Sequence, residues 1–169
     1  GAMLDNFRLI SNGPPPPSVT VSATPGTVTE GVAVLATATF TLSAAQAADV
    51  TVTYSTLSIT AMAGLDFTPV AAGTAIIPAG QTSAVVQISI LNDAIYETTE
   101  LFEVALTGAT LGAQALTAFG TAAITILDDE PVPASVTVAA TPPTVTQGVA
   151  ASATATLTLS AAQGVDTTV

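Results

Sequence analysis

The stretch Val32–Leu42 reads VAVLATATFTL, and it alternates apolar with small or polar residues along most of its length. Successive side chains of an extended strand point to opposite faces, so a period of two gathers one apolar set on a single face. A slip of one residue in strand pairing would turn that whole set to water. The stretch therefore predicts a β-strand that is buried on one side. The residues expected to face the core are Val34, Ala36, Ala38, Phe40 and Leu42.

Runs of the same kind lie on both sides of this stretch, separated by turn residues, and no segment has a helical period. Short strands between turns, without helices, are typical of an antiparallel Greek-key, Ig-like β-sandwich. We therefore expect an all-β fold of about seven strands. The predicted strands are Ser18–Ser22, Val32–Leu42, Asp49–Tyr54, Thr74–Ile77, Thr82–Leu91, the run around Phe102–Leu106, and Thr121–Leu127.

An internal repeat divides the chain of 169 residues. Ser135–Val169 aligns with Ser18–Val52 at a constant offset of 117, and 26 of the 35 aligned residues are identical. We expect residues 18–130 to form one complete module, 131–134 a connector, and 135–169 a truncated second copy. Residues 1–17 are expected to hold a tag scar, the end of a preceding module and a polyproline linker.

The truncated copy is too short to bury enough surface to fold alone. It is therefore expected to be ordered by packing on the first module or on a neighbouring molecule. One form of such packing is exchange with residues 18–52 of a second chain, which would make a homo-oligomer.

The composition narrows the classes of function. A net charge of −11 argues against nucleic acid and against anionic membrane surfaces as partners. No apolar run reaches the about 18 residues of a membrane-spanning helix, so membrane insertion is not expected. The chain has no Cys and therefore no disulfide. The absence of His, Cys and Lys removes most general bases and covalent nucleophiles, so we expect no enzyme and no catalytic residues.

Six of the twelve acidic residues lie in two places. Leu91–Phe102 (LNDAIYETTELF) carries three of them, and Asp128-Asp129-Glu130 ends a strand-like run. The only cationic side chain is that of Arg8, so the chain cannot neutralise this density of carboxylates by itself. Carboxylates held close together repel one another, and hard carboxylate oxygens favour Ca²⁺. The sequence therefore predicts Ca²⁺ as a cofactor.

Five short motifs occur in order between Val50 and Glu130. They are Tyr54-Ser55-Thr56, Ala63-Gly64-Leu65-Asp66-Phe67, Pro78-Ala79-Gly80-Gln81-Thr82, Asn92-Asp93-x-x-x-Glu97-x-x-Glu100-x-Phe102, and Ile126-Leu127-Asp128-Asp129-Glu130. In this order they resemble the Calx-beta domain, a module of sodium–calcium exchangers and of many bacterial surface proteins. The resemblance covers one complete module and the start of a second, and it suggests an extracellular multi-domain protein of bacterial type.

The resemblance implies a seven-stranded sandwich with Ca²⁺ gathered at one end. Asn92 and Ala94 stand where the exchanger pattern has acids, which implies fewer or weaker ions. In the second copy, Gln147 replaces Glu30 and weakens any equivalent site. The metal ligands that the resemblance implies are Glu30, Asp66, Asp93, Glu97, Glu100, Asp128, Asp129 and Glu130.

The expected function is that of a non-enzymatic calcium-binding module, a structural or adhesive unit of a tandem array in a secreted or cell-surface protein. Ca²⁺ would stiffen the module end and the connector to the next module. Adjacent modules are the expected partners, with another protein or a surface glycan as further candidates. Two alternatives remain open. One is a glycan- or protein-binding module in which calcium is absent or incidental, and the other is an inert spacer whose acidic loops are merely solvated.

Overall fold

The computed structural model describes residues 16–141, 143–144, 146–148 and 152–161, and all statements below concern these residues. The chain divides into two compact units, Gly1–Asp129 and Glu130–Val169. Most of the predicted leader, residues 1–15, and the end of the second copy, residues 162–169, lie outside the described residues. No helix among the described residues has the length and apolar character to cross a membrane.

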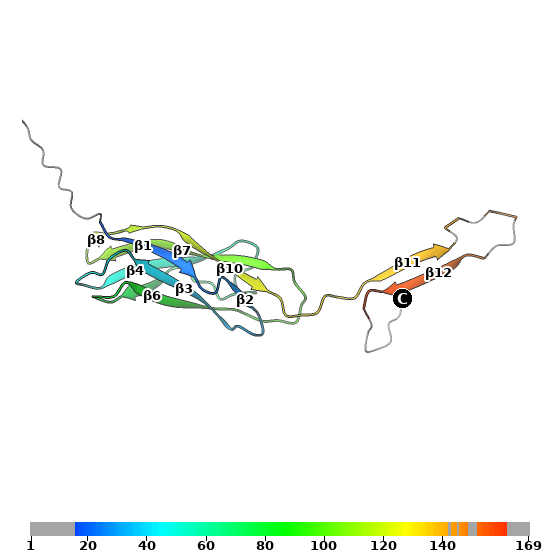
Figure 1. Cartoon of the computed structure of the whole chain (residues 1–169), viewed down its shortest axis with the longest axis horizontal. Coiled ribbons are helices and arrows are strands. Elements are labelled where there is room, and N and C mark those ends of the chain that lie inside the picture. The colour runs from blue at the N-terminus through cyan, green and yellow to red at the C-terminus, as the bar shows by residue number, and fades with distance from the viewer. Residues whose placement is uncertain (1–15, 142, 145, 149–151, 162–169) are drawn as a thin grey trace, which may run out of the picture. The chain divides into compact units, whose positions relative to one another are not determined.

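The first unit is a sandwich of two sheets (Figure 1). One sheet has the order β6-β3-β1-β9, and the other has the order β2-β10-β7-β4-β5, with β8 paired to β7. The all-β expectation is confirmed. The strands are β1 (Ser18–Ala23), β2 (Thr27–Thr29), β3 (Leu35–Leu42), β4 (Val50–Ser58), β5 (Gly73–Ile77), β6 (Ser83–Ser89), β7 (Glu100–Leu111), β8 (Gln114–Ala115), β9 (Thr117–Ala118) and β10 (Thr121–Leu127).

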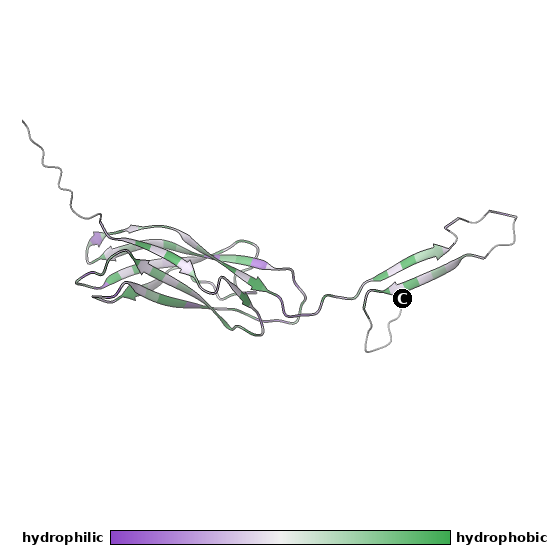
Figure 2. Cartoon of the chain, in the orientation of Figure 1, coloured by the Kyte–Doolittle hydropathy of each residue, from purple (hydrophilic) through white to green (hydrophobic). Residues whose placement is uncertain are grey.

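The core lies between the two sheets and is filled by the alternate residues of their strands. Figure 2 shows apolar positions interrupted by polar ones along these strands. Phe102, Val104 and Leu106 of β7 are all buried, as their spacing predicts. Phe67 lies outside the strands but is fully buried, and its ring stacks on that of Phe102 at 4.2 Å between centroids. This stack fastens the loop before β5 to the centre of the fold.

The prediction that Val34 faces the core is wrong. Its side chain is 69% exposed, and β3 begins only at Leu35. The reason is a turn after Glu30, in which Gly31 has a φ of +65° and the amide of Ala33 donates to the Thr29 carbonyl. A turn breaks the alternation of a strand, so the period of two applies only from Ala36 onward.

The short strands were not predicted, and two of their pairings are parallel. β9 pairs with β1, and β2 pairs with β10. A strand of two or three residues is too short to show a period in the sequence. The β2–β10 pair matters most, because it brings two distant parts of the chain to the same end of the sandwich.

The second unit contains an antiparallel pair, β11 (Val136–Thr141) and β12 (Thr154–Leu159). Its register repeats that of β1 and β3 at the offset of 117 residues, since Val136 pairs with Leu159 as Val19 pairs with Leu42. Every residue of both strands is exposed.

Candidate metal centre

Two acidic residues follow directly from the ends of parallel strands. Leu127 of β10 pairs with Thr29 of β2, and the amide of Glu30 donates to the Leu127 carbonyl at 3.0 Å. Because parallel strands run in the same direction, the residues that follow them leave the sheet at the same edge. Glu30 and Asp128 are therefore neighbours although they are far apart in the sequence.

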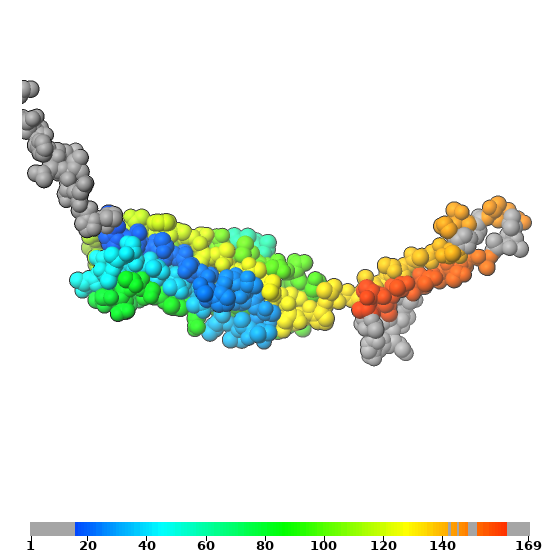
Figure 3. Space-filling view, in the orientation of Figure 1, coloured from blue at the N-terminus to red at the C-terminus, as the bar shows by residue number. Residues whose placement is uncertain are grey.

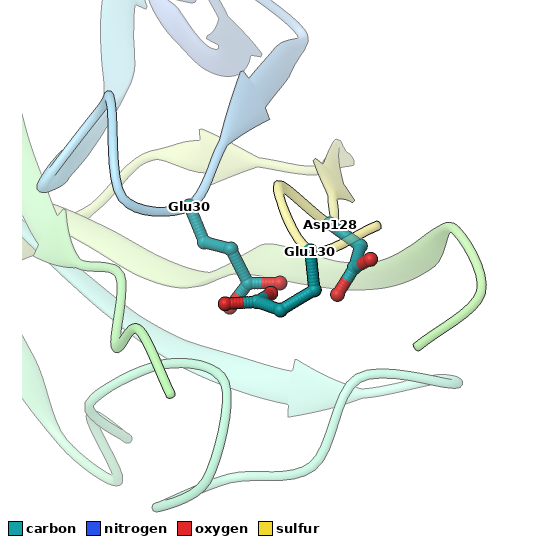
Figure 4. Close-up of side chains that lie close together, drawn as sticks. All are labelled: Glu30, Asp128 and Glu130. Atoms are coloured by element: carbon teal, nitrogen blue, oxygen red, sulfur yellow. The ribbon is translucent and has the colours of Figure 1, made fainter. Parts of the chain in front are cut away.

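Glu130 completes a group with these two residues. One carboxylate oxygen from each of Glu30, Asp128 and Glu130 lies within 4.8 Å of the others. Figure 4 shows the three side chains converging from the loop after β2 and from the chain after β10. Glu30 is only 5% exposed, and ionisable side chains are rarely this buried unless they are paired with an opposite charge. The described residues include no cationic side chain that could form such a pair. We call Glu30, Asp128 and Glu130 the first carboxylate group.

A second carboxylate group consists of Asp66, Glu97 and Glu100, whose oxygens also lie within 4.8 Å of one another. Asp66 is 6% exposed, and its carboxylate accepts a hydrogen bond from the Met62 amide at 2.5 Å, which closes the loop between them. Its carbonyl accepts from the Leu91 amide at 2.9 Å, which holds the loop against the chain after β6. Glu100 is the first residue of β7.

The two carboxylate groups are linked. The amide of Glu97 donates to Asp128 Oδ1 at 3.0 Å, so the acidic loop is hydrogen-bonded to the chain after β10. Glu100 pairs with Ile126 of β10, two residues before Asp128. An ion bound in one group would therefore act on the backbone that positions the other.

In the second carboxylate group, burial and mutual repulsion raise the pKa values of two of the acids. The pKa of Glu100 is raised to about 7, chiefly by burial and then by a hydrogen bond with Asp66 and by the negative charges of Asp66, Glu97 and Glu30. Burial and neighbouring acids also raise the pKa of Glu97. A cation placed among these oxygens would offset the repulsion between the carboxylates.

Two carboxylate oxygens have no hydrogen-bond donor among the described residues although they are buried from solvent. They are Glu100 Oε2 and Asp128 Oδ2. An unsatisfied buried carboxylate oxygen is costly, and buried charges in proteins are normally paired or bound to metals. The described residues include no Lys, Arg or His. The residues present therefore fit a hard cation, one in each group.

Two of the eight predicted ligands belong to neither group. Asp93 is exposed, and its Oδ1 accepts from the Ile95 amide at 2.7 Å. It nevertheless lies close enough to Glu97 to raise the pKa of that residue. The side chain of Asp129 lies outside both groups and approaches Gly31.

Gly31 is a structural requirement that sequence reasoning missed. A Cβ at this position would clash with Asp129 Oδ2 and would lie 2.8 Å from Asn92 Oδ1. The φ of +65° also favours glycine at this position. Two further oxygens thus meet beside the first carboxylate group. The glycine directly after Glu30 was the only sequence signal that could have indicated this approach.

The arrangement can bind cations but offers little other chemistry. All of its side-chain donors are carboxylate oxygens, with the amide oxygen of Asn92 beside them. Hard oxygen donors of this kind are the usual ligands of Ca²⁺.

Comparison with known proteins places this geometry in a family. The model of the Calx-beta domain matches residues 15–130. A crystal structure of the apo form of the Calx CBD1 domain is 25% identical, with a TM-score of 0.56, and the match covers 66% of this chain and 97% of that one. No curated protein matched.

Two longer structures are similar to the same part of the chain. CBD12 from CALX1.2 is 25% identical with a TM-score of 0.56 over 65% of this chain, and the calcium binding domain CBD12 of CALX1.1 is 26% identical with a TM-score of 0.55 over 64%. This chain spans only 44% and 45% of their respective lengths. With the family model matching 15–130, the chain belongs to the Calx-beta domain family.

Proposed function

We propose that residues 18–130 form a non-enzymatic Ca²⁺-binding module whose ions lie at the two carboxylate groups. The observation that carries this proposal is the pair of buried oxygens, Glu100 Oε2 and Asp128 Oδ2, which have no donor among the described residues. An ion in each group would satisfy these two oxygens, and the ion in the second group would offset the repulsion that helps to raise the pKa of Glu100.

The donor set favours Ca²⁺ over other ions. The chain contains no Cys or His, so it lacks the ligands that select zinc, copper or iron. Ca²⁺ accepts about six to eight oxygens in flexible geometry, whereas Mg²⁺ demands a near-ideal octahedron and gives up its water reluctantly. Carboxylates that come from four separate segments of the chain suit the flexible requirement. One of the similar structures is named as a calcium binding domain, which supports the same choice.

The effect of the ion would be mechanical. Glu130 directly precedes Pro131-Val132-Pro133, and proline restricts the backbone of the connector further. An ion held by Glu30, Asp128 and Glu130 would tie the start of this connector to the loop after β2. Without the ion, the carboxylates repel and the loops at this end of the sandwich should open first.

The module would be one of several in a longer secreted or cell-surface protein with a structural or adhesive role. The repeat from Ser135 onward supports the tandem arrangement. Adjacent modules would be the main partners of each module. The alternative is a glycan- or protein-binding module in which Ca²⁺ has no part.

Thermal unfolding of residues 1–169 in chelator, in millimolar Ca²⁺ and in millimolar Mg²⁺ tests the proposal. A ligand at 100 times its dissociation constant adds about 2.7 kcal/mol per site to the free energy of unfolding. We expect a Ca²⁺-selective rise of several degrees in the melting temperature.

A matched pair of variants locates the effect. Glu30→Gln removes one charge from the first carboxylate group and should reduce the Ca²⁺-dependent rise. Glu103→Gln removes one charge from β7 outside both groups and should leave the rise unchanged. No rise with Ca²⁺ would overturn the proposal, and glycan or protein binding that persists in chelator would then favour the alternative.

A further inference from the structure

The loop between β4 and β5, which carries Asp66, is joined to the start of β7 by three hydrogen bonds. The amides of Thr60 and Ala61 both donate to the Leu101 carbonyl at 3.0 Å. The amide of Leu101 donates in turn to Thr60 Oγ1 at 2.7 Å. Both backbone polar groups of Leu101 are therefore held by this loop. Figure 3 shows part of the loop on the surface of the first unit.

These hydrogen bonds lie close to two members of the second carboxylate group. Leu101 directly follows Glu100, and Thr60 precedes Asp66 by six residues in the same loop. The contact between Thr60 and Leu101 therefore joins the two segments that supply Asp66 and Glu100. The two carboxylates come from distant parts of the sequence, so their separation depends on such a connection.

The strand pairing of β4 with β7 ends before it reaches this point. The last pair of that ladder is Ser58 with Phe102, so Glu100 and Leu101 lie beyond it. Hydroxyl groups of Ser and Thr often bind backbone groups where regular pairing ends. Thr60 has this role here, because its hydroxyl accepts from an amide that the backbone of β4 does not reach.

We propose that Thr60 is a positioning residue for the second carboxylate group. Its hydroxyl holds Leu101, and thereby Glu100, against the loop that carries Asp66. That loop is itself closed by the hydrogen bond from the Met62 amide to the Asp66 carboxylate. Without the hydroxyl, the Leu101 amide would turn to water and the start of β7 would separate from the loop. Ca²⁺ binding would then have to restore the separation of the two carboxylates, at a cost in affinity.

The inference rests on the proposed function, and calorimetric titration with Ca²⁺ tests it. Thr60 is exposed, so substitutions there leave the core untouched. Thr60→Val keeps the shape of the side chain but removes the acceptor. It should weaken Ca²⁺ binding at the second group about three- to tenfold, the range that one net hydrogen bond is worth. Thr60→Ala lacks the hydroxyl as well and should act in the same direction, whereas Thr60→Ser should retain the affinity of the natural chain.

Thr56 supplies a matched control. Its Oγ1 accepts from the Val70 amide at 2.8 Å, and its own amide donates to the Val70 carbonyl at 2.8 Å. This is the same arrangement as that of Thr60 with Leu101, but neither Thr56 nor Val70 belongs to a carboxylate group. Thr56→Val should therefore leave the Ca²⁺ affinity unchanged.

Double variants show through which carboxylates Thr60 acts. If it acts through Glu100, Thr60→Val should add little to the loss of affinity caused by Glu100→Gln. The same change should add in full to Glu30→Gln, which alters the first carboxylate group. Additive losses in both backgrounds would contradict a role in positioning Glu100.

Amide hydrogen exchange in chelator tests the positioning without any ion. Thr60→Val should speed the exchange of the Leu101 and Met62 amides, and Thr60→Ser should not. Equal Ca²⁺ affinities of Thr60→Val and the natural chain would overturn the inference alone, even if the variant melts lower, since the hydroxyl would then only support the fold. A loss that Thr60→Ser does not restore would also overturn it. A natural chain that binds no Ca²⁺ would overturn the proposed function and this inference with it.

Discussion

Replacing Glu100 by glutamine should make the ion-free protein more stable at neutral pH and its affinity for Ca²⁺ weaker. The pKa of Glu100 is raised from 4.5 to about 7, chiefly by burial and then by the hydrogen bond and charge of Asp66. The folded chain therefore binds more protons than the unfolded chain between these two pH values. Under that condition the free energy of unfolding falls as the pH rises, and the destabilisation is complete above pH 7.

The magnitude follows from the same shift. A tenfold change in proton affinity is worth about 1.4 kcal/mol, so ionised Glu100 destabilises the fold by roughly 3 kcal/mol before solvent screening. Screening of this partly exposed side chain reduces the figure to about 2 kcal/mol. For a domain of this size that is a difference of roughly 6–10 °C in melting temperature.

The assay is thermal unfolding in chelator from pH 5 to pH 8, followed by Ca²⁺ titration. The natural chain should lose stability across the upper part of this range, and Glu100→Gln should lose much less and melt higher at pH 8. The variant should bind Ca²⁺ at least about tenfold more weakly, because calcium affinity depends on the number of charged ligands. Glu103→Gln should follow the natural chain in both measurements. If Glu100→Gln melts no higher than the natural chain at pH 8 in chelator, ionised Glu100 does not destabilise the ion-free fold.

Two further predictions concern the supports of the site. Gly31→Ala should lower the free energy of unfolding by about 1–2 kcal/mol, because the residue has a positive φ, and it should weaken Ca²⁺ binding by displacing Asp129. The control is Gly26→Ala, at a position with open space around it. Calorimetry should show an unchanged Ca²⁺ affinity for this control. Phe67→Ala should lower the free energy of unfolding by about 3–5 kcal/mol in denaturant titration, because its fully buried ring stacks on Phe102; a loss below about 1 kcal/mol would contradict the role given to this stack.

The local pattern of the sequence was sufficient for the class of fold and for most of the core. A period of two decides which face of a strand an apolar residue occupies, and this depends only on the strand itself. Phe102, Val104 and Leu106 therefore lie where they were expected. Val34 does not, because a turn at Gly31 interrupts the strand, and the sequence pattern continues through that turn without a visible break.

The residue types of the site were also visible in the sequence, since carboxylates without cations require a positive partner. Which carboxylates would meet was not visible. Glu30 meets Asp128 because β2 pairs in parallel with β10, and β2 has only three residues. Asp66 meets Glu100 because the loop that carries it is fastened by the buried ring of Phe67.

The sequence by itself thus determined the longer strands, most of their inward faces and the chemistry of the ligands, all of which depend on neighbouring residues along the chain. Only the tertiary structure decided the division of the carboxylates into two groups and the approach of Asp129 to Gly31. These features depend on which strands pair across long separations. That choice is made by the packing of the whole core rather than by any short stretch of sequence.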